Sequence, residues 1–223
     1  MIPEQEKEFW NILETFKTEG LLQHLMLIGS WAEYIYQNFF ESGFKANLRT
    51  TDVDFLYTNL RRPVGKSIDI IRALGDKGFV YSENRLSGVG KFVKDDILDI
   101  EFLIRVLGEG DPQHQRIPSI GVVGIGLRDV NMLVSYPLLL EVGGYTINVP
   151  EPEIYVLHKT LISSKRKKTE KREKDIQSVR SLIPHINKER MRVIFHKLPT
   201  KQQKVIKRVS DDNFLEISNV GGY

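Results

Sequence analysis

Two aspartates, Asp52 and Asp54, lie two residues apart within the otherwise apolar run of residues 51–56. If this run is a strand, both side chains project from one face, because successive residues of a strand alternate between faces. Two carboxylates in apolar surroundings are costly unless a partner neutralises them. Mg²⁺ does this well, since it accepts one or two carboxylates together with water and phosphate oxygens. The pattern therefore indicates a divalent metal site; the alternative is the solvated face of an edge strand.

A second acidic pair, Asp99 and Glu101, lies in the apolar run from Ile97 to Ile104 and also shares one strand face. Two such strands side by side would gather three or four carboxylates, a charge density that requires a cation and suits two-metal phosphoryl chemistry. One carboxylate can then also accept the proton of an attacking hydroxyl. The residues leave open whether Asp99 or Glu101 completes the set; the apolar neighbours of Glu101 most closely repeat those of Asp54, which favours Glu101.

A Gly29-Ser30 turn follows the apolar run Leu25–Ile28 and precedes a helical pattern that begins at Trp31. A strand, a glycine turn and a helix start together make an anion site, because glycine lets the backbone approach a phosphate and the first helical amides point outward. The serine adds a hydroxyl donor. The alternative is that Ser30 is only the N-cap residue of its helix.

The elements that must position these groups follow from hydrophobic periodicity. Helical and strand-like segments alternate through the first 149 residues, which predicts an α/β (α+β) fold with a small mixed sheet and flanking helices. We expect helices over residues 4–18, 31–40 and 66–74, strands over 25–28, 52–57 and 97–104, and a hairpin over 79–94. Between residues 105 and 149 we expect short strands, including Val130–Leu133 and Tyr145–Val149, and a loop around Gly121, Gly124 and Gly126.

The pattern changes at Pro150, beyond which the sequence is helical almost throughout. Helices are expected over residues 153–163, 170–182, 188–197 and 201–209. This change predicts a first domain over residues 1–149 and a C-terminal helical module over residues 150–223.

Charge is divided in the same way as the periodicity. The whole chain has 32 basic and 29 acidic residues, a net charge of +3. Residues 1–149 contain 15 basic and 20 acidic residues, net −5, whereas residues 150–223 contain 17 and 9, net +8. The basic module is expected to meet a polyanion, and its run from Lys165 to Lys174 lacks aromatic residues, so it suits backbone phosphates rather than stacked bases. The alternative is a solvated basic helix face.

Composition excludes several classes of protein. A chain of 223 residues with 41% hydrophobic and 27% charged residues is ordinary globular material, not collagen, coiled coil or disordered protein. Cysteine is absent, which excludes disulfides, thiolate zinc sites and a cysteine nucleophile and fits a reducing compartment. The longest apolar stretch, Ile120–Leu127, is far shorter than the roughly 20 residues of a membrane span, and the acidic N-terminus is unlike a signal peptide. We expect a cytoplasmic protein without membrane contact.

The order of these pieces resembles the DNA polymerase beta-type nucleotidyltransferase superfamily. Its pattern is a hydrophobic residue with Gly-Gly or Gly-Ser, a helix, two acids separated by one residue on a strand, and a later carboxylate. The matching pieces are Ile28-Gly29-Ser30, Asp52-Val53-Asp54-Phe55, and Glu101 or Asp99. Residues 153–159 and 166–175 also look like the helical part of bacterial nucleotidyltransferase-like families related to abortive-infection and toxin–antitoxin enzymes. There a lysine and an aspartate approach the nucleotide, and the matching residues are Lys159 and Asp175.

The resemblance implies a metal-dependent transfer of a nucleoside monophosphate from an NTP to an acceptor. Asp52, Asp54 and Glu101 would be the catalytic residues and would hold Mg²⁺ or Mn²⁺. Gly29, Ser30, Lys159 and Asp175 would form the nucleotide-binding set. The acceptor would be an RNA such as tRNA, a protein side chain or a small hydroxylated molecule. A toxin–antitoxin setting, with an antitoxin protein as partner, would follow from the resemblance alone.

Two other classes of function compete with this one. The first is a non-catalytic regulatory protein that retains the fold and binds nucleotide or nucleic acid. Intact acids at Asp52, Asp54 and a third position argue against it. The second is a DNA- or RNA-binding protein whose basic helices bind phosphate, with a steep salt dependence and no response to NTP or metal.

Overall fold

The computed structural model describes residues 3–46, 50–58, 60, 67–106, 108 and 113–217 of the chain. Contacts divide the described residues into two compact units. The first unit takes its residues from Met1–Phe39, Lys45–Asn131 and Pro137–Val149, and the second from Phe40–Phe44, Met132–Tyr136 and Pro150–Tyr223. Each unit has a core of its own.

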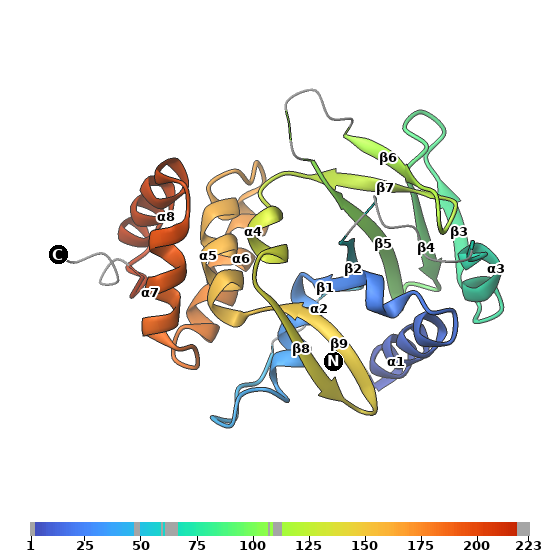
Figure 1. The fold of residues 1–223 in the computed structure, drawn as a ribbon, viewed down its shortest axis with the longest axis horizontal. Helices are drawn as coiled ribbons and strands as arrows, with labels where there is room; N and C mark the ends of the chain where they lie inside the picture. Colours follow the sequence, from blue (N-terminus) through green and yellow to red (C-terminus); the bar gives the residue numbers. More distant parts are fainter. Residues whose placement is uncertain are drawn as a thin grey trace. The chain divides into compact units, whose positions relative to one another are not determined.

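The first unit contains the sheet and the helices that flank it (Figure 1). In chain order its elements are α1 (Pro3–Thr18), the 3₁₀ turn η1 (Leu22–His24), β1 (Leu25–Ile28), α2 (Ser30–Tyr36), β2 (Asp52–Tyr57), α3 (Ile70–Gly75), β3 (Val80–Glu83), β4 (Gly90–Lys94), β5 (Leu98–Arg105), β6 (His114–Ile117), β7 (Val122–Leu127), β8 (Pro137–Val142) and β9 (Tyr145–Pro150). The one-turn helix α4 (Asn131–Val134) lies in the chain between β7 and β8.

Seven of these strands form one mixed sheet. Its main order is β1-β2-β5-β4-β3, with β2 parallel to β5 and the other neighbours in that order antiparallel. β7 pairs in parallel with the C-terminal end of β5 and antiparallel with β6, while β8 and β9 form a separate two-stranded sheet. The predicted mixed α/β fold is confirmed. β2 is an interior strand, since it pairs with β5 from Asp52 and with β1 from Asp54, so the alternative of an edge strand is wrong. Among the described residues Asp52, at the start of the strand, is paired only with β5.

One face of this sheet is apolar and is covered by α1. Val53 and Phe55 of β2 and Phe102 of β5 are buried on that face. Phe16 of α1 packs edge-on against Phe55, with ring centroids 4.9 Å apart, and lies 5.8 Å from Phe102. Burial of one such aromatic side chain stabilises the fold by about 1.5–3 kcal/mol. Strand alternation then sends the neighbouring residues of β2 and β5 to the opposite face.

Several predicted elements differ from those observed. The glycine-rich run is not a loop, because Val122–Leu127 forms strand β7. A Cβ at residue 126 would lie 2.4 Å from the Gln113 carbonyl oxygen, and one at residue 124 would lie 2.8 Å from Ile104. Glycine therefore serves the close approach of neighbouring chain rather than a turn. The expected strand Val130–Leu133 is also wrong, since α4 covers most of it.

Two helix ends are shifted as well. α2 ends at Tyr36, four residues before the predicted end at Phe40. α3 begins at Ile70 because the Asp69 side chain accepts a bond from the Arg72 amide at 3.0 Å and caps the helix. The predicted start of that helix at Lys66 lies outside the described residues.

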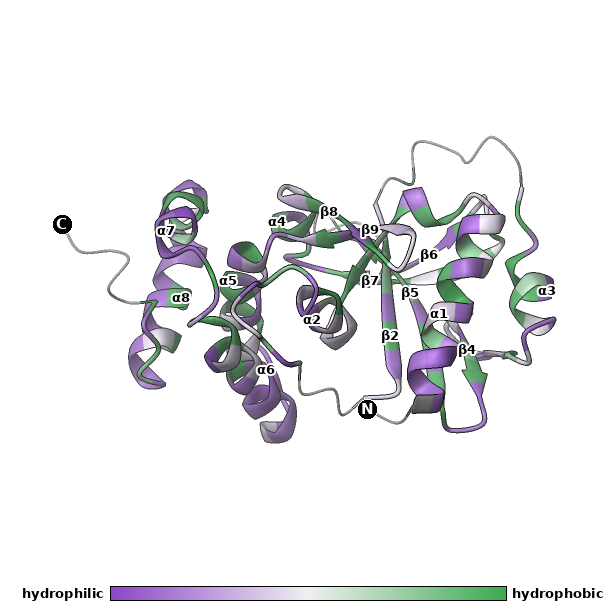
Figure 2. Cartoon of the chain, turned by 90° about the horizontal axis from the view of Figure 1, so that it is seen from below, coloured by the Kyte–Doolittle hydropathy of each residue, from purple (hydrophilic) through white to green (hydrophobic). Residues whose placement is uncertain are grey.

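The second unit contains the four predicted C-terminal helices: α5 (Pro152–Ser163), α6 (Thr169–Leu182), α7 (Lys188–Lys197) and α8 (Thr200–Asp212). α5 is the central helix, since α6, α7 and α8 all contact it and it buries Ile154, Leu157 and Leu161. The first residues of α6 are exposed, and the hydropathy colouring shows that this helix is largely hydrophilic (Figure 2). Within the ranges given above, no helix combines the length and apolar character that crossing a membrane requires.

Candidate active site

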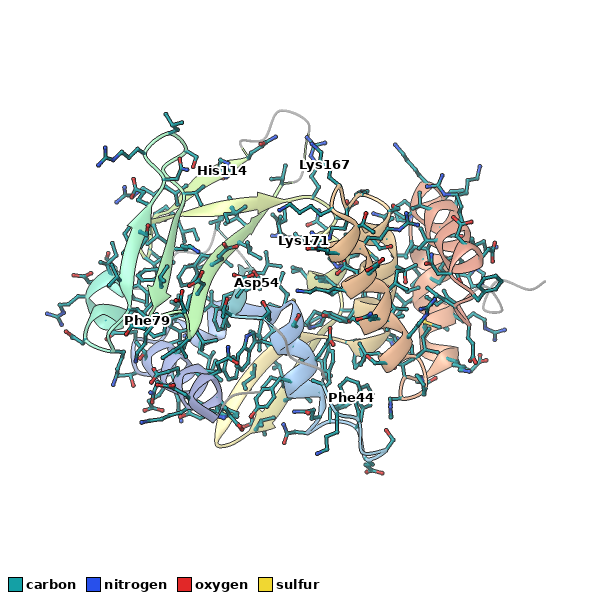
Figure 3. All side chains as sticks on the ribbon, turned by 180° about the vertical axis from the view of Figure 1, so that it is seen from behind. Phe44, Asp54, Phe79, His114, Lys167 and Lys171 are labelled. Atoms are coloured by element: carbon teal, nitrogen blue, oxygen red, sulfur yellow. The ribbon has the colours of Figure 1, made fainter. Side chains whose placement is uncertain are left out.

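The four acids of β2 and β5 share one face of the sheet. Asp52 is in register with Asp99, and Asp54 with Glu101. Residues in register on neighbouring strands point to the same side, and neighbouring strands are about 4.8 Å apart. The four carboxylates therefore form two neighbouring cross-strand pairs on the face of the sheet opposite Phe55 and α1. Asp52 is exposed, and the other three are partly exposed, so solutes can reach them (Figure 3, where Asp54 is labelled).

Gly29 brings the Gly-Ser turn against this acidic face. Ile28, the last residue of β1, is in register with Asp54, and Gly29 follows it with a φ of 68°. A Cβ at residue 29 would lie 2.5 Å from Oδ2 of Asp54, so any other residue there would force the Asp54 carboxylate to move. Gly29 occupies the N-cap position of α2 without a side-chain capping bond, and Ser30 is the first helical residue. Ser30 is therefore not an N-cap residue.

Lys91 of β4 also reaches the acidic face, and the sequence analysis did not single it out. It is in register with Glu101, and its Nζ lies 2.5 Å from Oδ2 of Asp99. The hydrogen bond to Asp99 raises the pKa of Lys91, and the nearby charges of Asp99, Glu101 and Asp52 act in the same direction against partial desolvation. The alternating pattern of residues 79–94 predicted a hairpin and so placed Lys91 on a strand. That pattern does not show which other strand the hairpin pairs with, so it could not place Lys91 beside the acids.

The carboxylate face has the donor chemistry of a Mg²⁺ site. Among the described residues, no three histidine or acidic side chains are close enough together to form a complete metal cage. Mg²⁺ does not need one, because it is usually bound through one or two carboxylates and completes its octahedron with water and substrate phosphates. The oxygen donors of Asp52 and Asp54, on one face of one strand, fit that requirement.

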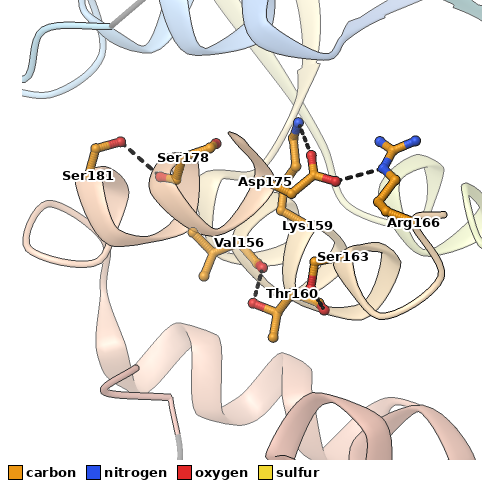
Figure 4. Close-up of polar contacts among 8 residues, drawn as sticks. All are labelled: Val156, Lys159, Thr160, Ser163, Arg166, Asp175, Ser178 and Ser181. Atoms are coloured by element: carbon orange, nitrogen blue, oxygen red, sulfur yellow. Dashed lines mark hydrogen bonds and ion pairs between the residues drawn. The ribbon is translucent and has the colours of Figure 1, made fainter. Parts of the chain in front are cut away.

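Lys159 and Asp175, both predicted to bind nucleotide, form an ion pair within the second unit. Lys159 Nζ in α5 lies 2.8 Å from Oδ1 of Asp175 in α6 (Figure 4). The other oxygen of Asp175 accepts a bond from Arg166 Nε at 2.7 Å, and only 4% of the Asp175 side chain is exposed. Arg166 was not predicted as a site residue. Its place in the basic run was visible, but its bond to Asp175 depends on how α5 and α6 pack.

Comparison with known proteins gives one family and several related folds. A family model described as nucleotidyltransferase matches residues 7–199. An antigenic nucleotidyltransferase-like protein from Paracoccidioides brasiliensis has a similar structure, with a TM-score of 0.53 and 13% identity over 98% of this chain and 92% of that one. No curated protein matches the sequence significantly.

Two structures of the antibiotic-resistance factor ANT(2'')-Ia are also similar. The solution structure has a TM-score of 0.52 and 12% identity, over 98% of this chain and 97% of that one. The crystal structure with adenylyl-2''-tobramycin has a TM-score of 0.51 and 14% identity, over 91% and 97%. At these identities the likeness concerns the fold, whereas the family model covers most of the sequence. The chain therefore belongs to the nucleotidyltransferase family.

Proposed function

We propose that this protein transfers a nucleoside monophosphate from an NTP to a hydroxyl acceptor, with Mg²⁺ or Mn²⁺, at the acidic face of the first unit's sheet. The observation that carries the proposal is the parallel register of β2 and β5, which aligns Asp52 with Asp99 and Asp54 with Glu101. A nucleotidyltransferase must bind the negatively charged triphosphate of its NTP. Carboxylates alone would repel the triphosphate, so an acidic face can bind it only when a cation lies between them.

Each acid has a proposed role in the reaction. Asp52 and Asp54 hold the metal, and Glu101, with Asp99 as the alternative, completes the site. The metal supplies neutralisation of the phosphate charge that develops during transfer. A carboxylate of the third position accepts the proton of the acceptor hydroxyl. The hydroxyl oxygen bonds to the α-phosphorus while the bond to the β-phosphate oxygen breaks, and pyrophosphate leaves.

The remaining predicted residues are proposed to bind the nucleotide. Gly29 and Ser30 are proposed to offer backbone amides and a hydroxyl to phosphate oxygens at the start of α2. Lys159 is proposed to neutralise phosphate charge, with Asp175 holding its ammonium group at 2.8 Å. The part played by Lys159 and Asp175 is carried by the resemblance of their helices and is tested by substitution.

Two kinds of acceptor are proposed, each with its own support. The structural neighbour ANT(2'')-Ia was solved with adenylyl-2''-tobramycin, which favours a small hydroxylated molecule such as an aminoglycoside. The net charge of +8 on residues 150–223 favours an RNA such as tRNA. A protein acceptor and an antitoxin partner follow from the toxin–antitoxin resemblance alone.

The test is a transfer assay with α-labelled NTPs, Mg²⁺ and separate pools of tRNA, protein and aminoglycosides. We expect label on one pool from the wild-type protein and none from Asp54→Asn. Labelling by both proteins would reject the site, and no labelling of any pool, with no NTP-dependent shift in melting temperature, would reject the proposed reaction.

A further inference from the structure

Asp175 in the second unit holds two cationic side chains at once, one on each carboxylate oxygen. Lys159 Nζ lies 2.8 Å from Oδ1, and Arg166 Nε lies 2.7 Å from Oδ2. The carboxylate is almost fully buried, so water competes little for these bonds, and they are stronger than at an exposed site. Two cations on one carboxylate leave the cluster with a net positive charge.

Arg166 presents the outer part of its guanidinium beyond this pair. Its side chain is 37% exposed, whereas that of Lys159 is 12% exposed. Figure 4 shows the two terminal nitrogens of Arg166 directed away from the carboxylate. A guanidinium held through Nε keeps the planar edge formed by its terminal nitrogens, which matches two oxygens of a phosphate.

Both cations are oriented before any ligand binds. Lys159 extends over the Tyr155 ring, with Nζ 5.5 Å from the ring centroid, and ends on Asp175. Arg166 lies in the connection between α5 and α6, where its backbone amide bonds to the Ser163 carbonyl at 3.3 Å. Pre-oriented side chains lose less conformational entropy on binding, so more of the contact energy contributes to affinity.

The surroundings favour an anion with several charges. Lys167, Lys168 and Lys171 are exposed near Arg166 in sequence. Residues 165–174 contain seven basic residues against two acidic ones, Glu170 and Glu173, and no aromatic side chain. Clustered cations raise the local potential for anions, while stacking on bases needs aromatic rings. The ligand chemistry is therefore phosphate rather than nucleobase.

We propose that Lys159 and Arg166 form a phosphate-binding pair that Asp175 positions, with Arg166 as the residue that makes the bidentate contact. This inference deepens the proposed function, on which the assignment of Lys159 to nucleotide phosphates rests. The phosphates come either from the triphosphate of an NTP or from a nucleic-acid backbone. The competing role is a structural clamp between α5 and α6.

The experiment measures binding of inorganic tripolyphosphate to the full chain by calorimetry without metal. Arg166→Gln is expected to weaken binding about tenfold, the loss of one charge-assisted bidentate contact. Arg166→Lys keeps the positive charge but loses the planar pair of terminal nitrogens, and its affinity is expected to lie between those of the wild type and Arg166→Gln. Lys167→Gln is the matched control: it removes the same charge from the next residue and is expected to change binding less than about twofold.

Competition then separates the two sources of phosphate. If the pair binds nucleotide, a non-hydrolysable ATP analogue displaces tripolyphosphate and a 20-nucleotide single-stranded RNA at 150 mM salt does not; if it binds a backbone, the RNA displaces it. In either case, Arg166→Gln must also weaken the binding of the molecule that displaces tripolyphosphate. Equal effects of Arg166→Gln and Lys167→Gln, or no effect of either, overturn the proposal, as does a lowered melting temperature of Arg166→Gln with unchanged tripolyphosphate affinity.

A failure of this inference is distinguishable from a failure of the proposed function. Asp54→Asn is expected to lose transfer and to bind tripolyphosphate as the wild type does. If no acceptor is ever labelled but binding still depends on Arg166, the phosphate pair stands and the reaction is wrong. If transfer occurs and Arg166→Gln leaves phosphate binding unchanged, the reaction stands and the pair is rejected. Asp175→Glu, which keeps the charge, is expected to retain more affinity than Asp175→Asn.

Discussion

Gly29 and Asp54 lie so close that a side chain at residue 29 would begin 2.5 Å from the Asp54 carboxylate oxygen Oδ2. The Asp54 carboxylate can therefore keep its position beside the turn between β1 and α2 because residue 29 has no Cβ. Its φ of 68° is also a conformation that glycine adopts without steric cost. One glycine thus serves both the shape of the turn and the placement of the carboxylate.

Gly29→Ala is expected to reduce transfer by more than about 100-fold, because the added methyl group displaces Asp54 from its position. With φ 68° and ψ −159°, the backbone of Gly29 is in a region that is essentially restricted to glycine, so alanine there costs about 1–3 kcal/mol. Gly20→Ala is the matched control, since Gly20 has a φ of 71° and no atom within 4 Å of its Cβ position. Both variants should lose stability in urea unfolding, Gly29→Ala at least as much as Gly20→Ala, and only Gly29→Ala should lose activity. Equal rates for the two variants would show that the contact with Asp54 does not matter.

The third carboxylate is decided by comparing Asp99→Asn with Glu101→Gln. Removal of the group that accepts the proton is expected to lower the transfer rate by about 10²–10⁴-fold, and removal of the other by less than tenfold. Asp99 has Lys91 as an ion-pair partner at 2.5 Å, so its loss also leaves a lysine without its carboxylate. Single-turnover rates at saturating NTP, with Mn²⁺ binding measured separately, distinguish loss of metal from loss of the proton acceptor. Wild-type rates in both variants would remove β5 from the site.

Lys94 and Glu8 are expected to make stability depend on pH. Lys94 Nζ lies 2.7 Å from Glu8 Oε2, and the two side chains are 18% and 9% exposed. Burial alone would raise the pKa of Glu8, but hydrogen bonds from Lys94 and Asn11 outweigh it and lower that pKa. A lowered carboxyl pKa contributes stability that is present above the unfolded pKa and is lost as pH falls through the folded pKa.

Lys94→Met is therefore expected to cost about 1–3 kcal/mol of unfolding free energy at pH 7 and clearly less at pH 3. Urea unfolding at the two pH values measures the difference. Lys45→Met, at an exposed lysine, is the control and should change neither value much. A loss from Lys94→Met of the same size at both pH values would mean that packing of the lysine stem or its 2.7 Å bond to the Lys77 carbonyl, not the ion pair, supplies the stability.

Gly126→Ala is expected to destabilise the protein by about 1–3 kcal/mol, because a Cβ there would lie 2.4 Å from the Gln113 carbonyl oxygen and 2.5 Å from Val106 Cγ2. Gly75→Ala, at the end of α3, meets no atom within 4 Å and should be close to neutral. Thermal melting of the two variants provides the comparison. If both melt with the wild type, the close approach of β7 to the preceding chain is not a constraint on stability.

Local periodicity in the sequence was enough to predict most helices and strands, and the alternation of β2 placed Asp52 and Asp54 on one face. The same reasoning failed at β7, where the glycines suggested a loop. Local preference reports how a residue's own backbone behaves, but Gly124 and Gly126 are required by atoms of other segments. These positions are glycine because of tertiary contacts, and a short stretch of local sequence carries no information about such contacts.

The sequence by itself therefore indicated the acidic pairs, the Gly-Ser turn, Lys159 and Asp175 as candidates and predicted the kind of element on which each would lie. Only the tertiary structure decided that Asp54 is in register with Glu101, that Gly29 lies against Asp54, and that Lys91 pairs with Asp99. It also brought Arg166 onto the second oxygen of Asp175. The physical reason is that strand register and helix packing are set by burial of apolar faces far apart in the chain, and these charged contacts follow from that packing.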